Sequence, residues 1–455
     1  MSTAIRNRAS WTFGLPKTFH AFGVNIILLP LGIATSVLIA HTVGPTGKGS
    51  LDLIVATAAL LGMVLSLSLP QGVTFVVAQG QVAANVIASQ LVVVSLLQAL
   101  VALLVLSVLW FTDYFQLFLP NWGLWIIGGV VLYVWVELIT KFWAAIHTGQ
   151  QQIAVVNNSE FIGRVTQFVG LFILFGILYL SGKQLSVGFL FLAALVASAL
   201  ISLLLFASLG FKFQFSRDLT GLKGAAAFAL PCYAANVAQF LNYKLDVFVV
   251  GFFAGTASVG RYTLAVSLGQ LLWLMSNSVA SVLLPKIAAS TASSDEGAGI
   301  RHTARVTRLT LWATALCGLA LGVLGTQVIP LVYGEPFRPS VAALIWILPG
   351  IVIFSVANVL AAYIAGIGKP RLNLLVSSIS LVVTIALDLA LIPKFNIVGA
   401  AIASSVSYTL SAVLLIAFFS RETGAGLREI LLPTAEDVKM LLSVVRLRVR
   451  SESTV

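Results

Sequence analysis

The chain has 455 residues, of which 59% are hydrophobic and 9% charged, and its formal net charge is +11. Soluble domains carry about 25% charged residues, so the composition excludes a soluble protein and leaves no room for a sizeable soluble domain. The two cysteines and four histidines lack the spacing of metal ligands, so we expect no metal site and no other cofactor, and a chain this apolar is not expected to bind nucleic acid.

Apolar stretches long enough to cross a bilayer follow one another along the chain, separated by turn residues. The first six predicted helices span residues 19–43, 51–69, 86–111, 122–146, 153–180 and 186–209. The next six span residues 226–253, 257–285, 306–333, 340–366, 371–392 and 397–420. The sequence therefore predicts an all-α, polytopic membrane protein with about twelve transmembrane helices.

Lysine and arginine are distributed unevenly over the predicted connections. Of the 26 basic residues, 18 fall on the side of the two termini and four fall on the opposite side: Lys48, Lys183, Arg338 and Lys394. Basic connections remain on the cytoplasmic side of a membrane, so both termini are predicted to be cytoplasmic.

The predicted organisation has five parts. They are a cytoplasmic N-terminus (1–18), an N-lobe (19–210), a cytoplasmic linker (211–225), a C-lobe (226–420) and a cytoplasmic basic tail (421–455). The tail either lies on anionic lipid headgroups or extends into solvent.

The two halves of the chain carry related motifs 211 positions apart. The glycine pair of residues 44–49 aligns with that of residues 255–260, and Asn25 aligns with Asn236. Because six spans separate the copies, both begin on the same side of the membrane. The halves are therefore predicted to be parallel repeats that form two lobes around a cleft.

A family resemblance is carried by three stretches. They are GPTGKGSLDLIVATAALLGMVLSLSLPQGVTFVVAQ (44–79), DVFVVGFFAGTASVGRYTLAVSLGQ (246–270) and GKPRLNLLVSSISLVVTIALDLALIPKFNIVGAAIAS (368–404). They resemble the polysaccharide and oligosaccharide-lipid flippases, whose superfamily also contains multidrug and toxin extruders and lipid II flippases.

The resemblance implies a V-shaped bundle of two six-helix lobes that alternates between inward-open and outward-open forms. It implies a sugar chain as cargo, often carried on undecaprenyl diphosphate, and delivery across the bacterial inner membrane. Membrane lipids, a glycan polymerase and chain-length proteins are the accompanying partners that it suggests.

Charged side chains within the predicted spans are few, and each costs about 2.5–3.5 kcal/mol near the centre of a helix in lipid. Glu137 with Lys141 and Glu160 with Arg164 have the i,i+4 spacing, acid first, of intrahelical ion pairs. Arg164 is expected near the membrane midplane. These pairs either fix the packing of the lobe or face a hydrated cavity.

The second half carries a polar stripe on the predicted helix 226–253. Its members are Asn236, Gln239, Tyr243 and Asp246, and a similar stripe on the next helix contains Gln270. Such stripes either line a lumen or join helices. Lys244, Asp246 and Arg261 are predicted to cluster near the outer helix ends, and Asp388 is interpreted as a helix-end residue.

Phosphates favour arginine and lysine, and sugar hydroxyls favour amides. The candidate substrate-binding residues are therefore Arg164, Lys244, Arg261, Lys141, Asn25, Asn236, Gln239 and Gln270. The candidate carriers of a coupling ion are Glu160, Glu137 and Asp246.

The predicted function is a flippase or exporter of a lipid-linked oligosaccharide or polysaccharide unit. A drug or small-solute antiporter of the same superfamily is one alternative, and it would need a lobe rich in carboxylates and aromatic residues. A membrane-bound sugar polymerase is another, and it would need acids or histidines in a long loop. No catalytic residues are predicted, and no Walker-type glycine-rich loop precedes a helix.

Overall fold

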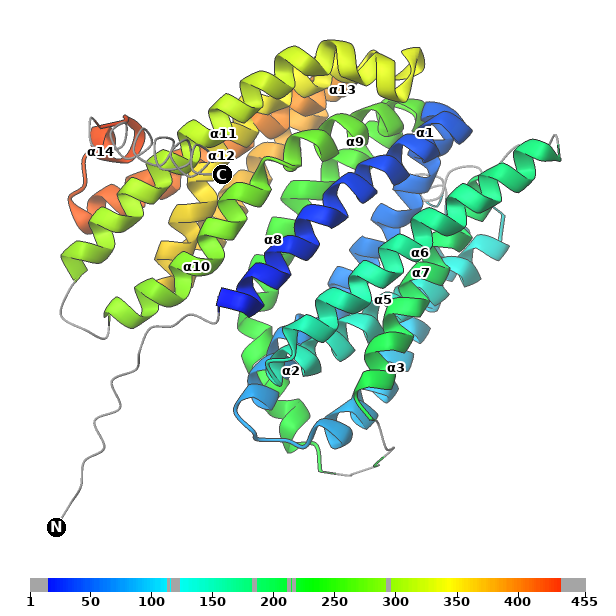
Figure 1. Ribbon diagram of the computed structural model, residues 1–455, viewed down its shortest axis with the longest axis horizontal. Coiled ribbons are helices and arrows are strands. Elements are labelled where there is room, and N and C mark those ends of the chain that lie inside the picture. Colours follow the sequence, from blue (N-terminus) through cyan, green and yellow to red (C-terminus); the bar gives the residue numbers. More distant parts are fainter. Residues whose placement is uncertain are drawn as a thin grey trace, which may run out of the picture. The chain divides into compact units, whose positions relative to one another are not determined.

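The computed structural model describes residues 15–112, 115, 123–181, 186–210, 214, 218–291 and 296–434. Every regular element in these residues is a helix, which confirms the predicted fold class (Figure 1). The first 14 residues and the basic tail after residue 434 lie outside the described residues.

The helices occupy the stretches that the apolar runs predict. In the first half they are α1 (Leu15–Ser66), α2 (Leu69–Ala78), α3 (Ala84–Trp110), α5 (Trp125–Gly149), α6 (Ile153–Leu180) and α7 (Val187–Ser208). In the second half they are α8 (Thr220–Ala254), α9 (Thr256–Gln270), α10 (Trp273–Thr291), α11 (Glu296–Tyr333), the 3-10 turn η1 (Glu335–Phe337), α12 (Ser340–Gly366), α13 (Pro370–Thr423) and α14 (Leu427–Leu431). The short α2 was not predicted; it begins with Pro70 in its first turn, a position that suits proline.

Nine described helices are long and apolar enough to cross a membrane, and the bent pair α9 and α10 adds a tenth. Two of the nine, α1 and α13, contain a residue with a non-helical backbone: Gly44 (φ 64, ψ −172) and Asn396 (φ 50, ψ −131). Glycine and asparagine are the residues that tolerate positive φ. Counting each of these two kinked helices as two crossings gives the twelve that were predicted.

The chain divides into two compact units. Unit 1 consists of Met1–Thr42, Leu65–Leu104 and Ile127–Leu230, and unit 2 of Val43–Val64, Val105–Ile126 and Pro231–Val455. One boundary falls beside the kink at Gly44, and another falls at Pro231 within α8.

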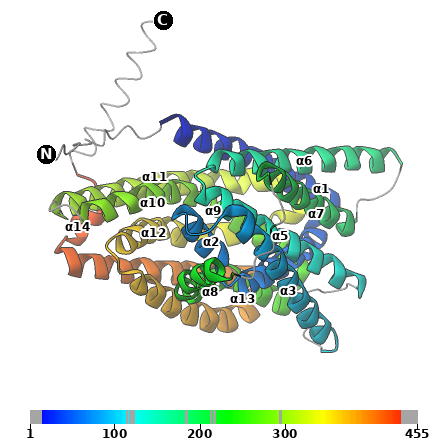
Figure 2. The same ribbon diagram turned by 90° about the horizontal axis from the view of Figure 1, so that it is seen from below.

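Unit 1 is built around the short α2. Val73 and Val76 of α2 are fully buried in a cluster with Ile87 of α3 and Trp143 of α5. Helices α6 and α7 run alongside each other in the same unit, in contact through Gly163 (Figures 1 and 2). Unit 1 is therefore a helical bundle in which α5, α6 and α7 are neighbours.

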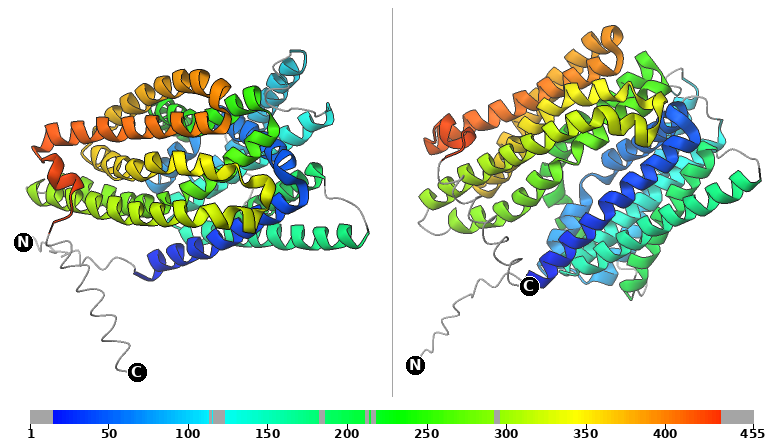
Figure 3. Two further views of the ribbon diagram at one scale, coloured as in Figure 1. Left: turned by 90° about the horizontal axis from the view of Figure 1, so that it is seen from above. Right: turned by 45° about the horizontal axis from the view of Figure 1, so that its top comes forward.

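Unit 2 is built around α12, which packs against α9, α10, α11 and α13. Helix α12 lies between α11 and α13 (Figures 2 and 3). The backbone N–H of Gly350 donates a hydrogen bond to Ser405 Oγ at 2.9 Å, which brings α12 close to α13. Because the most apolar part of α12 is buried to a larger share than that of any other candidate span, α12 is the centre of this unit.

The aligned glycines of the two repeats contact one another within unit 2. A Cβ on Gly49 would lie 1.8 Å from the carbonyl oxygen of Thr256, and a Cβ on Gly260 would lie 2.1 Å from that of Pro45. Thr256 is the residue 211 positions after Pro45, so the contact is reciprocal: each repeat offers the same positions to the other. Only residues without a side chain permit this approach.

We expect Gly260→Ala to lower the free energy of unfolding by about 1–3 kcal/mol, because a methyl group has no space beside Pro45. The measurement is thermal unfolding of the purified protein in detergent. Gly170→Ala is the matched control, since no atom lies within 4 Å of a Cβ at this position of α6. Equal melting temperatures for Gly260→Ala and the wild type would contradict the close contact.

Candidate functional site

A cavity of about 210 Å³ lies among α5, α6 and α7 in unit 1. Its charged lining residues are the four that the sequence placed in adjacent spans: Glu137 and Lys141 on α5, and Glu160 and Arg164 on α6. Its uncharged polar lining residues are Tyr133, Thr140, Gln167 and Ser198. The structure thus brings together two acids, two bases and several hydroxyl and amide groups.

Glu160 and Arg164 form the predicted pair on α6, with 3.9 Å between Glu160 Oε1 and Arg164 Nη2. This distance is too long for a hydrogen bond, and the two side chains are 46% and 56% exposed. A pair of this kind contributes at most about 1 kcal/mol to stability. The N–H groups of the Arg164 guanidinium therefore do not donate a hydrogen bond to Glu160.

The predicted pair on α5 does not form within the described residues. Glu137 instead accepts a hydrogen bond of 2.7 Å from Ser198 Oγ of α7, and the Lys141 side chain is exposed. The spacing puts the two side chains on one helix face, but a hydroxyl on the neighbouring helix offers the carboxylate a short charge-assisted bond. Lys141 can carry its ammonium toward water on its long stem.

In unit 2 the predicted polar stripe of α8 makes contacts between helices. Gln239 accepts a hydrogen bond of 2.7 Å from Ser377 of α13. Asp246 accepts one from Tyr262 of α9, and one of 3.2 Å from Ser404 of α13. Of the two interpretations of this stripe, these bonds correspond to the one in which it joins helices.

Tyr243, the aromatic member of the stripe, belongs to a cluster of rings. Its ring centroid lies 5.1 Å from that of Trp273, 6.0 Å from Phe354 and 6.2 Å from Tyr408. The neighbouring Asn242, which the sequence analysis did not single out, donates to the carbonyl oxygen of Ser377 at 2.8 Å. The face of α8 around Tyr243 is thus packed against α10, α12 and α13.

Of the predicted cluster of Lys244, Asp246 and Arg261, Lys244 is near enough to Asp246 to interact with it electrostatically, whereas Arg261 bonds to another element. Arg261 Nε donates a hydrogen bond of 2.9 Å to the carbonyl oxygen of Pro336 in η1, while Asp246 bonds elsewhere. Lys244 and Gln270 are half-buried, as is Asn236. Asn25 lies in α1, and its side chain lies outside the described residues.

Asp388 was interpreted as a helix-end residue, but in the structure it is fully buried within α13. Neither of its carboxylate oxygens has a hydrogen-bond partner among the described residues. It is near enough to Asp246, which is 2% exposed, to interact with it electrostatically. Two buried carboxylates that repel each other favour binding of a proton or a cation, and the Lys244 ammonium also interacts electrostatically with Asp246.

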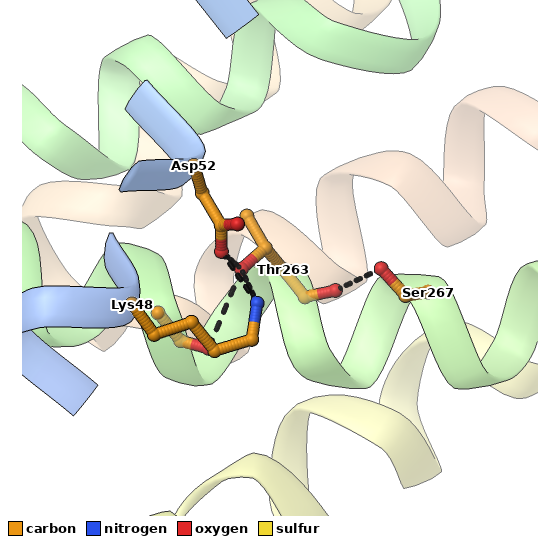
Figure 4. Close-up of polar contacts among 5 residues, drawn as sticks. Lys48, Asp52, Thr263 and Ser267 are labelled. Carbon is orange, nitrogen blue, oxygen red and sulfur yellow. Dashed lines mark hydrogen bonds and ion pairs between the residues drawn. The ribbon is translucent and has the colours of Figure 1, made fainter. Parts of the chain in front are cut away.

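Lys48 was counted as an outer-loop charge, but it is buried in α1 and bonded to Asp52, with 2.6 Å between Nζ and Oδ2 (Figure 4). Thr263 of α9 donates a hydrogen bond to the same carboxylate oxygen and lies 3.4 Å from Lys48 Nζ. Ser267, one turn further on, donates to the carbonyl oxygen of Thr263 at 2.6 Å. Asp52 and Thr263 are 211 positions apart, so the repeat offset is the signal that could have found this contact.

Helices long enough to cross a membrane, with a charged cavity among three of them, are typical of a transporter. A family model for the lipid II flippase MurJ matches residues 126–450, more than half of the chain. The chain therefore belongs to the lipid II flippase MurJ family. The membership confirms the superfamily that the three sequence stretches indicated.

Individual relatives are more distant. The probable low-salt glycan biosynthesis flippase Agl15 of Haloferax volcanii is 24% identical over 40% of this chain and 38% of its own length, so the match spans well under half of that relative. A structure of the lipid II flippase MurJ in an inward closed conformation has a TM-score of 0.73 at 16% identity, covering 90% of this chain and 88% of that one.

An inward-facing multidrug resistance MATE family transporter of the MOP superfamily has a TM-score of 0.72 at 14% identity, covering 89% of this chain and 98% of that one. Both structural likenesses are at low identity and concern the fold. They agree with the predicted two-lobe helical fold.

We expect Asp52→Ala to lower the free energy of unfolding by roughly 3 kcal/mol, because it leaves the Lys48 ammonium, 8% exposed, buried without its counter-charge. Thermal unfolding measures this change. The double substitution Lys48→Met with Asp52→Leu should recover most of the loss, since it removes both charges.

The matched control is Glu335→Ala. Glu335 and Arg338 form an ion pair of similar length, 2.7 Å, but their side chains are 68% and 63% exposed. The bond from Arg338 lowers the pKa of Glu335, yet solvent screens the pair, so we expect a much smaller loss of stability than for Asp52→Ala. If Asp52→Ala cost no more than Glu335→Ala, the buried ion pair would have no special role in stability.

Proposed function

We propose that the protein moves a lipid-linked oligosaccharide or polysaccharide unit across the cytoplasmic (inner) membrane by alternating access. The observation that carries the proposal is the cavity of unit 1, in which Arg164 and Lys141 lie with two carboxylates among otherwise apolar spans. Membership of the lipid II flippase family supports it, as does the name of Agl15, a probable glycan biosynthesis flippase.

The lining suits the charged head of such a substrate. Arg164 offers a planar fork of donors to a diphosphate and Lys141 a mobile ammonium. Glu137, Glu160 and Gln167 offer acceptors to sugar hydroxyls. Pockets for drug-sized ligands measure about 300–1,000 Å³, so a cavity of about 210 Å³ suits the diphosphate head rather than a whole glycan.

Alternating access needs a contact that closes the transport path on one side of the membrane and that can break. The contact of Gly49 with Gly260, together with the Asp52–Thr263 bond, joins the two repeats within unit 2. Residues 44–49 connect the first two predicted crossings, which places them on the outer side in the predicted orientation. We infer that this contact is the outer closure, which opens when cargo is released.

Directional transport needs a source of free energy, and the buried acids of unit 2 are suited to a coupling ion. Asp246 was already a candidate carrier, and Asp388, which interacts with it electrostatically, has no hydrogen-bond partner among the described residues. A proton or a monovalent cation bound at either carboxylate would relieve their repulsion. Glu137 and Glu160 remain candidates in unit 1.

The orientation and the partners follow from the same proposal. Both termini are assigned to the cytoplasm by the distribution of basic residues. The substrate and membrane lipids are the direct partners, and a glycan polymerase and chain-length proteins would act on the exported unit.

Arg164→Ala is expected to abolish most glycan export. Export should fall by about tenfold or more, because one charge-assisted contact to phosphate is worth about 1.5–3 kcal/mol. The measurement is surface glycan in a strain that depends on this protein, with membrane levels of the variant checked in parallel. Arg338→Ala, at an exposed arginine outside the cavity, is the control and should export normally. Wild-type export by Arg164→Ala would remove the cavity from the transport path.

A comparison of strains with and without the wild-type protein separates the alternative function. A small-solute antiporter would be recognised by protein-dependent efflux of a cationic dye, with no effect on surface glycan. Dye efflux without glycan export would overturn the proposed cargo.

Asp388→Asn is expected to leave the fold intact, because it keeps the shape of a buried side chain and removes a charge. Transport in vesicles should lose its dependence on an imposed proton or sodium gradient. Glu335→Gln, at an exposed acid, should keep that dependence. Gradient-driven transport by Asp388→Asn at the wild-type rate would exclude Asp388 from coupling.

A further inference from the structure

A second cavity, of about 760 Å³, lies in unit 2 between the N-terminal part of α11 and residues 427–434, which include α14. These residues are called the segment around α14. Its described lining residues are Arg301, His302, Ala304, Arg305, Arg308, Glu429 and Thr434. Three arginines and one carboxylate give these described residues a net charge of +2 with histidine neutral. The cavity is thus built to receive an anion.

The three arginines lie on one face of α11. Arg301, Arg305 and Arg308 have the spacing i, i+4 and i+7. The opposite face carries a row of four buried threonines, Thr303, Thr307, Thr310 and Thr314, each at most 6% exposed. Because α11 packs against α10 and α12, the threonine face is the inner one and the arginine face is the outer one.

Helix α14 packs against α11 and lies near its start (Figure 1), and Glu429 of α14 lines the cavity together with the arginines. The Arg308 guanidinium donates a hydrogen bond to the carbonyl oxygen of Glu429 and is 6% exposed. Trp312 Nε1 donates to the carbonyl oxygen of Leu431 at 2.9 Å. These two bonds satisfy carbonyl groups of α14 and hold Arg308 as the buried arginine of the lining, while Arg301 and His302 are exposed.

The same face of α11 continues as an apolar surface. After Trp312, which is 48% exposed, come Leu316, Leu319 and Val323, which are 70%, 68% and 63% exposed. Their spacing from Arg308 keeps them on the arginine side of the helix. From Trp312 to Val323 the helix rises roughly 16 Å.

This order of side chains matches the parts of a phospholipid. The candidate span of α11 is Gly299–Tyr333, so the arginines lie in its first turns, at the depth of the headgroups, and the exposed Trp312 lies where interfacial tryptophans are found. The leucines and valine then lie at the depth of the acyl chains. A free phosphate would contact the arginines alone, whereas a lipid would contact both the arginines and the exposed apolar side chains.

We propose that the arginine face of α11 and the segment around α14 form a binding site for an anionic phospholipid, whose phosphate occupies the cavity and whose acyl chain lies along Leu316, Leu319 and Val323. In the membrane orientation that the basic residues predict, this site lies in the inner leaflet. The site is separate from the cavity of unit 1, and it does not depend on the identity of the transported cargo.

The test is native mass spectrometry of the delipidated full-length protein in detergent, titrated with phosphatidylglycerol, phosphatidylcholine or inorganic phosphate. The wild type is expected to prefer phosphatidylglycerol. Arg301→Ala with Arg305→Ala should weaken that binding by about tenfold or more, because two charge-assisted contacts are lost. Arg371→Ala is the control, since Arg371 is exposed, predicted to lie on the same side of the membrane and outside the cavity.

Two further variants keep the test decisive. Arg301→Ala alone changes an exposed side chain and is not expected to disturb folding, so it should show a smaller loss in a folded protein. Leu319→Gln should weaken phosphatidylglycerol binding and leave phosphate binding unchanged. Equal loss in Arg371→Ala, unchanged binding in the double variant, or phosphate binding as tight as that of the lipid would each overturn the proposal.

Discussion

Charged groups in a bilayer-spanning chain must reach water, a counter-charge or a hydrogen-bond partner, and the sites of this protein follow from that constraint. In unit 1, Arg164 and Glu160 remain about half exposed because they line a cavity. In unit 2, Lys48 is buried and held at 2.6 Å by Asp52. The arginines of α11 meet the same constraint at the membrane interface, beside α14.

The repeat gives the second organising feature. Equivalent positions of the two halves meet at Gly49 with Gly260 and at Asp52 with Thr263, each pair 211 residues apart. Reciprocal contacts of this kind arise where an axis relating two similar units passes between them. The glycines allow the helices to touch, and the ionic group adds a polar bond that can be broken without exposing apolar surface. Both properties suit a contact that opens and closes.

The helices could be predicted from the sequence because apolar runs and turn residues are local signals. The ion pairs could be predicted only in part. The spacing of Glu137 and Lys141 puts them on one face, but the actual partner of Glu137 is Ser198, 61 residues away on α7, and nothing in the local pattern indicates it. Glu160 and Arg164 do pair, because no such hydroxyl competes for Glu160 among the described residues.

Burial was the other property that the sequence did not supply. Lys48 lies between two glycines and was taken for a loop residue, and Asp388 lies near Pro393 and was taken for the end of a helix. Both are buried in continuous helical stretches, where the chain bends at Gly44 and at Asn396 instead. Long-range packing decides such cases, although for Asp52 and Thr263 the repeat offset contained the information.

Cysteine accessibility tests the central claim most directly, namely that the charged residues of unit 1 face a hydrated chamber that admits a negatively charged glycolipid head. A single cysteine would replace Thr140, which lines the cavity, in a variant without Cys232 and Cys317. We predict rapid modification by a membrane-impermeant thiol reagent and protection by a prenyl-diphosphate oligosaccharide. Labelling as slow as that of a cysteine at the exposed apolar position Leu104 of α3, or labelling that the glycolipid does not affect, would contradict the account.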